Sequence, residues 1–190
     1  MNKPFNDEPV ESLVEKFLAQ GGTVLDLRLK YLGDPGVAYL AQRQELVRLT
    51  ELNLERNDIT DQGVQALSQS RIITGLKVLH LERNAIGDEG AKSIAQSPAL
   101  SHLTTLHLWK NRIGPEGAQA LAESIHLVNL ETLDLAHNKI GDEGARALAQ
   151  SQTLTGLKFL ELFGNDLTGE GIHALKESQA FPNLQTMILE

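Results

Sequence analysis

The sequence predicts an α/β solenoid: a right-handed horseshoe with a parallel β-sheet on its concave face and α-helices on its convex face. Three observations lead to this fold class. A leucine motif returns every 27 residues, at Leu49, Leu76, Leu103, Leu130, Leu157 and Leu184. Each copy opens with the alternating apolar residues of a short strand and continues with apolar residues at helical spacing. A fixed period of this length is the signature of stacked repeats.

The first expected element is an N-terminal capping helix within residues 1–21. Its apolar residues recur at helical spacing, at Val10, Leu13, Val14, Phe17 and Leu18. Asn6 or Asp7 can cap its start, and Gly21 and Gly22 follow its end. We expect this helix to cover the open apolar face of the first coil.

The repeat domain is expected over residues 22–190. It begins with an imperfect repeat at 22–48, in which Lys30 stands where the others have Asn. Regular repeats follow at 49–75, 76–102, 103–129, 130–156 and 157–183, with a partial strand at 184–190. The unit is L-x-x-L-x-L-x-x-N-x-I/L-x-x-x-G-x-x-x-L/I. Because no unit can bury its apolar side alone, stability must come from stacking.

Within each repeat the L-x-L segment predicts a strand, and an Asn follows where the chain must turn. The Asn amide can satisfy backbone groups of the turn that would otherwise be buried unpaired. The second half predicts a helix, with Thr60 and Thr168 as N-caps and Pro115 at a first helical position. The glycine that recurs in this half indicates close packing between coils.

The final strand contains Leu184, Met187 and Leu189 and has no helix after it. An uncovered strand edge exposes unpaired backbone groups. We therefore expect either further chain or another molecule to cover this edge, and self-association of two copies is one such arrangement.

The repeated unit resembles the leucine-rich repeat family. The long helical half, as in IGDEGARALAQS, is most similar to the ribonuclease-inhibitor-type subgroup, which also occurs in NOD-like receptors and in the activator of the Ran GTPase. The regular GDEGA helices also look like those of bacterial repeat proteins. The resemblance implies a scaffold for protein binding, but this fold hosts unrelated functions. Because the chain has no cysteine and few repeats, ribonuclease inhibition is not implied.

Composition removes several classes of function. A net charge of -8 argues against nucleic-acid binding, which needs clustered Lys and Arg. The absence of cysteine excludes disulfides and thiolate metal sites. No apolar run has the length of a membrane span, and the first residues lack the pattern of a signal peptide. We expect no cofactor and no membrane contact, and a location in the cytoplasm or, after export, in a host cell.

The strand residues that point away from the core predict the binding surface. Trp109, the single tryptophan, belongs to an outward column, as does Phe163 two strands away, and Phe159 lies on the same strand as Phe163. With Ala136 between them, Trp109 and Phe163 should border a depression. Exposed aromatic residues with polar surroundings are typical interface anchors. The alternative is that the two rings stack over Ala136 and only shield the sheet.

Carboxylates in the same columns, Glu55, Glu82, Asp134 and Glu161, predict a basic partner with an apolar anchor. A solvated ladder of ion pairs with Arg28, Arg56 and Arg83 is the alternative.

His80 and His107 share a column with Asp134 and Glu161. Such residues could bind zinc, but side chains in a flat column lie parallel rather than convergent, so we expect neither a metal site nor catalysis. The favoured function is a non-catalytic module that binds a protein or peptide on its concave face. The alternatives are a regulator of a small GTPase or other enzyme and, more remotely, a metal-dependent hydrolase using His80, His107 and Asp134. The residues expected to contact the partner are Trp109, Phe163, Phe159, His107, His80, Glu55, Glu82, Asp134 and Glu161.

Overall fold

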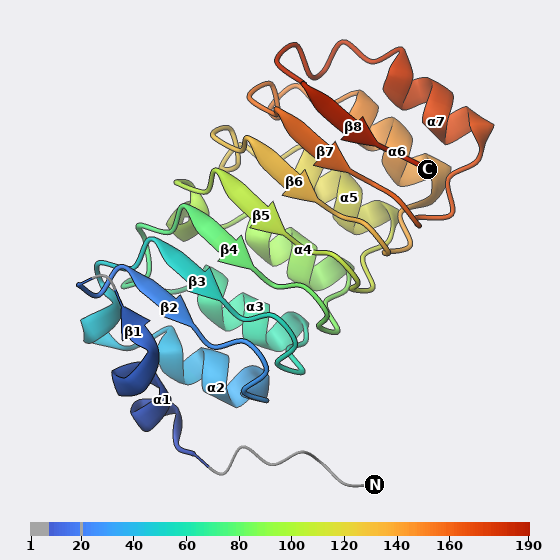
Figure 1. The fold of residues 1–190 in the computed structure, drawn as a ribbon. Coiled ribbons are helices and arrows are strands. Elements are labelled where there is room, and N and C mark those ends of the chain that lie inside the picture. Colours follow the sequence, from blue (N-terminus) through green and yellow to red (C-terminus); the bar gives the residue numbers. More distant parts are fainter. Residues whose placement is uncertain (1–7, 20) are drawn as a thin grey trace, which may run out of the picture.

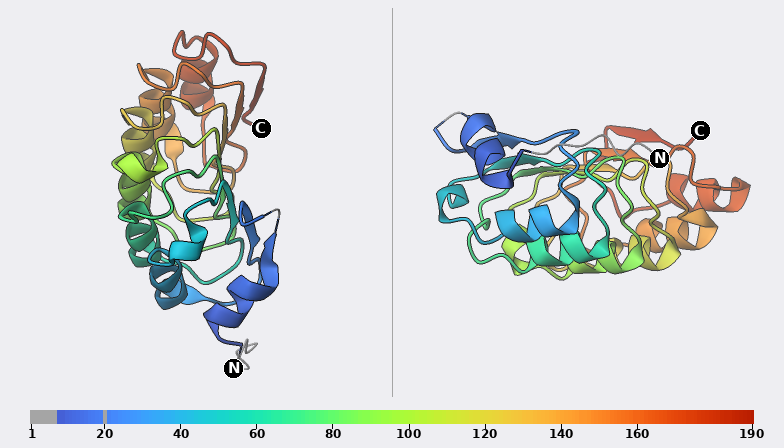
Figure 2. Two further views of the ribbon diagram at one scale, coloured as in Figure 1. Left: turned by 90° about the vertical axis from the view of Figure 1, so that its left-hand side faces the viewer. Right: turned by 90° about the horizontal axis from the view of Figure 1, so that it is seen from below.

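The computed structural model describes residues 8–19 and 21–190. Its strands form one open 8-stranded sheet in chain order, β1 to β8, and the helices form a second layer behind the sheet (Figure 1). Seen from the side, the stack is bowed, with helices α2 to α7 along its outer, convex side (Figure 2). The predicted α/β solenoid is therefore confirmed.

The strands are only two or three residues long. They are β1 Leu18–Ala19, β2 Val24–Asp26, β3 Glu51–Asn53, β4 Val78–His80, β5 Thr105–His107, β6 Thr132–Asp134, β7 Phe159–Glu161 and β8 Thr186–Ile188. The helices are α1 Val10–Phe17, α2 Gly33–Leu40, α3 Asp61–Ser68, α4 Asp88–Ala95, α5 Pro115–Ala122, α6 Gly141–Ala149 and α7 Gly169–Lys176. Short 3-10 helices lie at Gln44–Leu46 and Pro98–Leu100.

Strands β2 to β8 pair in parallel with a constant offset of 27 residues. Leu79, for example, lies between Leu52 and Leu106. The central residue of each strand from β2 to β7 is buried and the residues on either side of it are partly exposed. Since a shift of one residue would turn every side chain to the opposite face, this pattern confirms the predicted phase of the repeats.

The N-terminal helix is shorter than the sequence suggests. Helix α1 buries Leu13 and Val14 against the first coil, but it ends at Phe17. Leu18, which has helical spacing in the sequence, instead has extended backbone and begins β1, antiparallel to β2. This pairing supplies the outer edge of β2 with backbone hydrogen bonds that a helix could not provide. The expected capping residues, Asn6 and Asp7, lie outside the described residues.

A ladder of asparagines, all buried except the partly exposed Asn84, connects successive coils. The Asn111 amide Nδ2 donates to the carbonyls of Leu81 in the preceding repeat, at 2.9 Å, and of Leu108 in its own repeat, at 3.0 Å. Its Oδ1 accepts from the backbone N–H of Ile86 at 3.1 Å. Asn57, Asn84, Asn138 and Asn165 make the corresponding bonds. One side chain thus satisfies three buried backbone groups, as the sequence predicted.

The N-termini of the helices are capped as expected, and a second set of contacts stabilises them. The hydroxyls of Thr60 and Thr168 accept from the second backbone N–H of their helices, and Pro115 begins α5. The structure also contains a carboxylate ladder at the same place, which the sequence pattern does not predict. Asp88 Oδ1 at the start of α4 accepts from the backbone N–H groups of Gly114 and Gly117 in the next repeat, at 2.7 and 2.8 Å. A carboxylate is favourable there because helix N-termini carry partial positive charge.

The carboxylate ladder explains the recurring glycine. A Cβ atom added to Gly117 would lie 2.6 Å from Asp88 Oδ1, too close for any side chain. Gly63, Gly90 and Gly171 meet an aspartate of the preceding repeat in the same way, whereas a Cβ atom at Gly144 would lie 2.5 Å from Cγ2 of Ile140 in its own repeat. Among the described residues, no helix has the length and apolarity that a membrane span needs.

Replacing Asn111 with Ala should lower the free energy of unfolding by about 3 kcal/mol, because several buried backbone groups lose their partners at ~1–3 kcal/mol each. Urea denaturation followed by circular dichroism measures the change. Asn129 is the matched control, because it is exposed and donates a single bond to the Ser101 carbonyl. Equal costs for Asn111→Ala and Asn129→Ala would contradict the role of the ladder.

Replacing Gly117 with Ala should destabilise the fold by about 2 kcal/mol, since the new methyl group must displace the Asp88 carboxylate. Gly169 starts α7 and has no atom within 4 Å of an added Cβ atom. Gly169→Ala should therefore be neutral or slightly stabilising through helix propensity. Thermal unfolding of both variants tests the pair, and a Gly117→Ala protein as stable as Gly169→Ala would disprove the steric argument.

Candidate functional site

The concave surface is built from the strand residues that flank each buried leucine and from the residue that follows each strand by two positions. Leu106 and Leu108 are fully buried, while His107 and Trp109 on the opposite face are partly exposed. Trp109 lies two residues beyond the end of β5, so its side chain stands at the rim where the strands turn toward the helices. The repeat register thus places Trp109 outside the core, as predicted.

Four side chains from four successive repeats form a continuous aromatic row: Arg83, Trp109, His137 and Phe163. The Arg83 guanidinium lies over the Trp109 ring, 4.4 Å from its centroid. The His137 ring contacts both aromatic rings edge to face, with centroid distances of 6.1 Å to Trp109 and 5.1 Å to Phe163. Phe163 ends the row and is 44% exposed.

Trp109 and Phe163 were expected to border a depression over Ala136, but the structure shows a different arrangement. Ala136 is only 1% exposed, and the ring between Trp109 and Phe163 belongs to His137, so the two predicted anchors do not stack on each other. Gly164 makes this possible. An added Cβ atom there would lie 2.7 Å from His137 Nδ1, and its backbone φ of +71° also favours glycine. The signal in the sequence was a glycine in a column where the other repeats carry side chains.

The structure separates Phe159 from the aromatic row. Phe159 starts β7 and pairs in register with Thr132 and Thr186, whereas Phe163 lies beyond the other end of the same strand. Glu161 lies between them on the concave face, beside Asp134. Phe159 and the aromatic row therefore lie on opposite sides of the carboxylate pair Asp134 and Glu161.

His80 and His107 form a second feature of the surface. They pair in register on β4 and β5, and their rings stack 4.8 Å apart with an angle of 10° between their planes. His80 Nδ1 lies 3.1 Å from Glu82 Oε1, and His107 Nδ1 lies 3.7 Å from Asp134 Oδ2. Each ring therefore turns toward its own carboxylate. In the described part of the chain, no group of three or more His, Cys, Asp or Glu residues could hold a metal ion.

The surroundings of the histidine pair are negatively charged. The interaction with Asp134 raises the pKa of His107, and the charges of Glu82 and Glu161 act in the same direction. Burial, together with the nearby Asp134, raises the pKa of the Glu161 carboxyl group. Glu82 Oε2 is buried and has no hydrogen-bond partner among the described residues. The centre of the concave face thus carries more negative charge than its own cations balance.

Toward the N-terminal end the carboxylates are paired. Arg28 forms a two-pronged contact with Asp26, with distances of 2.7 and 3.0 Å to its two oxygens. Arg83 Nε lies 3.7 Å from Glu55 Oε1, the cross-strand pairing that the repeated LERN segment allowed. Arg28 and Arg83 are engaged there, whereas Glu82 and Asp134 lie closest to His80 and His107.

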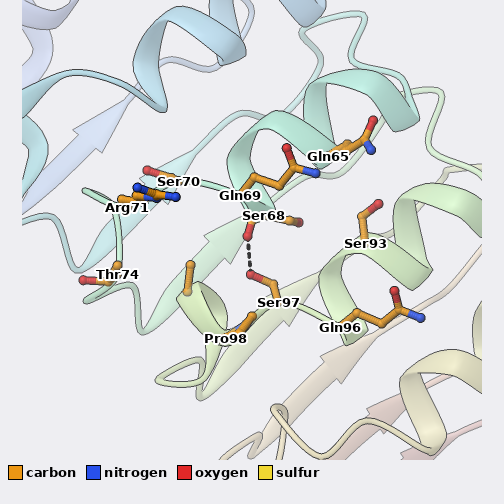
Figure 3. Close-up of a pocket in the computed structure, with 11 residues that line it drawn as sticks. Gln65, Ser68, Gln69, Ser70, Arg71, Thr74, Ser93, Gln96, Ser97 and Pro98 are labelled. Atoms are coloured by element: carbon orange, nitrogen blue, oxygen red, sulfur yellow. Dashed lines mark hydrogen bonds between the residues drawn. The ribbon is translucent and has the colours of Figure 1, made fainter.

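A hollow lies elsewhere, at the C-terminal ends of α3 and α4 (Figure 3). Its volume is about 880 Å³, and Arg71 is the one charged residue in a lining dominated by side-chain amides and hydroxyls. Ser97 Oγ donates to the Ser68 carbonyl across this hollow at 2.6 Å, so part of the lining joins two coils. None of the residues predicted to bind a partner lines it.

Comparison with known proteins agrees with the repeat pattern. A sequence profile described as "Leucine Rich repeat" matches residues 49–68, 74–95, 99–122, 126–149 and 153–176. No curated protein matches the chain. Among solved structures, internalin C2 from Listeria monocytogenes is similar with a TM-score of 0.56 and 26% identity, over 81% of this chain and 56% of internalin C2.

A chain in the octameric complex of latrophilin 3, Unc5D and FLRT2 is similar with a TM-score of 0.53 and 19% identity, over 91% of this chain and 47% of that one. The protein therefore spans about half the length of these two solved structures. At 19% identity the second likeness concerns the fold alone.

Replacing Asp134 with Asn should lower the pKa of His107 toward its ordinary value of about 6.5. A raised pKa in the folded state means that the charged imidazole stabilises the fold below about pH 6.5 and that this contribution is lost as pH rises through the raised value. Wild type should therefore lose more stability between pH 6 and 8 than Asp134→Asn. Imidazole resonances in NMR spectra give the pKa, and Glu131→Gln, at an exposed ion pair with Lys158, is the control. An unchanged His107 pKa in Asp134→Asn would contradict this coupling.

Proposed function

Because this chain belongs to the leucine-rich repeat family, we propose that it is a non-catalytic module that binds a protein or peptide on its concave face. The observation that supports this most is the aromatic row Arg83, Trp109, His137 and Phe163. Solenoids of this kind present extended concave surfaces suited to such binding.

The aromatic row has the properties of an interface anchor. Trp and Arg are the residue types that most often dominate binding energy, especially when their positions are fixed before binding. Here Arg83 covers one side of the Trp109 ring, and His137 contacts it from the next repeat. Phe163 remains open to solvent at the end of the row. A partner that inserts an apolar side chain beside Phe163 would bury this ring at little entropic cost.

The proposed partner is basic as well as apolar. Arg28 and Arg83 are engaged by Asp26 and Glu55, so the carboxylates of Asp134 and Glu161 are available to cations of another molecule, and the mostly buried Glu82 adds negative charge beside them. Charge complementarity of this type favours fast association and selects among partners. We assign the partner contacts to Trp109, Phe163, Phe159, His107, His80, Glu55, Glu82, Asp134 and Glu161.

Other expectations from the sequence remain proposals. They are the ribonuclease-inhibitor-type subgroup, the division into a capping segment at 1–21 and a repeat domain at 22–190, and self-association through the edge of β8. Regulation of a small GTPase or other enzyme is the alternative function, and it would use the same surface. A location in the cytoplasm or in a host cell also remains a proposal, and either place is compatible with a binding module.

The double variant Trp109→Ala with Phe163→Ala should keep the fold but bind the partner more weakly. Both residues project outward, so circular dichroism and the unfolding temperature should change little. Affinity for the partner should fall at least about 30-fold, since hot-spot truncations cost ~2 kcal/mol or more. Affinity capture from source-cell lysate, with mass spectrometry, compares the variant with wild type.

Ile125→Ala is the matched control, because Ile125 is 74% exposed and lies on the helix side of the solenoid beside Ser124 and His126. It removes an exposed apolar side chain without touching the concave face. Equal capture by wild type and the double variant would show that the aromatic row is not the anchor.

A further inference from the structure

The stacked His80–His107 pair has a property that binding alone does not require. Its two rings lie face to face 4.8 Å apart on the concave surface, both partly exposed, and both can gain a proton. A positive charge on one ring would lie directly beside the other ring and repel a second positive charge there. Histidine is the side chain whose charge ordinarily changes between pH 5 and 8.

The groups around the pair favour the first proton. On the His80 side, Asn53 of β3 pairs with it in register, Asp26 of β2 also interacts with its charge, and Glu82 binds its Nδ1 atom. On the His107 side, Asp134 follows on β6, and Glu161 on β7 adds a further negative charge. Two arginines of the concave face have partners of their own: Arg28 binds Asp26, and Arg83 lies between Glu55 and Trp109.

We infer that the His80–His107 pair is a proton-operated control of the concave surface: neutral rings leave the surface acidic and able to hold a cationic segment, whereas protonation in weak acid releases that segment. The part of this inference that concerns release of a bound segment rests on the proposed function. The proton-binding half depends only on the two rings and their carboxylates, so it can be tested without a partner.

Protonation changes the balance of charge at the surface centre. Three carboxylates, Glu82, Asp134 and Glu161, face two histidines, so full protonation removes most of the local negative charge. Unit charges a few ångströms apart at an exposed site interact strongly enough to alter a dissociation constant several-fold. We therefore expect a cationic segment to bind about tenfold more weakly at pH 5.5 than at pH 7.5.

The first experiment measures the coupling directly. Imidazole resonances of the whole protein are followed by NMR from pH 8.5 to 4.5, in wild type and in the single variants His80→Gln and His107→Gln. Wild type should take up its two protons in two separate steps, and the remaining ring of each variant should titrate in a single step. A single shared step in wild type, at the same midpoint as in the variants, would overturn the coupled pair.

The second experiment measures the effect on binding. Fluorescently labelled decalysine is the probe, and its dissociation constant is measured by anisotropy at pH 7.5 and 5.5. The readout is the ratio of the two constants within each protein, so any loss of affinity common to both pH values cancels. Wild type should give a ratio of about ten. The His80→Gln/His107→Gln double variant should give a smaller ratio, because only the carboxylates still change charge between the two pH values. His173→Gln, at an exposed position on α7, should keep the wild-type ratio.

The outcomes separate the two proposals. Equal pH ratios in wild type and the double variant, with decalysine bound, would overturn the proton control and leave a basic partner standing. No decalysine binding by wild type at either pH would overturn both the basic partner and its release by acid. In that case two-step titration would still establish the coupled histidine pair.

Discussion

The whole structure depends on satisfying backbone groups that are buried wherever a strand turns toward its helix. Such turns have no regular hydrogen-bonding partner of their own, and leaving them unpaired in the core would be costly. Asparagine side chains of the next repeat bind these groups, as Asn111 does for Leu81 and Ile86. Because each coil completes its neighbour, a shift of the strands or turns relative to one another would break the ladder. The constant interval of 27 residues follows from this requirement.

A fixed register converts distant sequence positions into neighbours, and the chain uses this to build its concave surface. Trp109, His137 and Phe163 come from three successive repeats, yet they form continuous ring contacts. The row exists because Gly164 offers no side chain where every earlier repeat has one. A single departure from the repeat pattern therefore creates the most distinctive contact of the surface, while the central residue of every strand from β2 to β7 remains leucine.

The balance of positive and negative charge changes along the same surface, from the N-terminal strands to the C-terminal ones. Cations and carboxylates neutralise each other around β2 and β3, through Arg28 with Asp26 and Arg83 with Glu55. The next strands along the sheet, β4 and β5, carry His80 and His107, and the equivalent positions of β6 and β7 carry the carboxylates Asp134 and Glu161. The negative charge around His107 and Asp134 connects the two proposals, because a partner's cations and solvent protons would compete for it.

The sequence by itself determined the fold class, the phase of the strands, the buried asparagine ladder and the outward position of Trp109, since all of these follow from periodicity and alternation. Only the tertiary structure decided the end of α1 at Phe17, the bonds from Asp88 to the next helix, the place of His137 between two aromatic rings and the stacking of His80 on His107. Periodicity fixes where a Cβ atom points. What its side chain touches depends on rotamers and on atoms of adjacent coils, which no single repeat encodes.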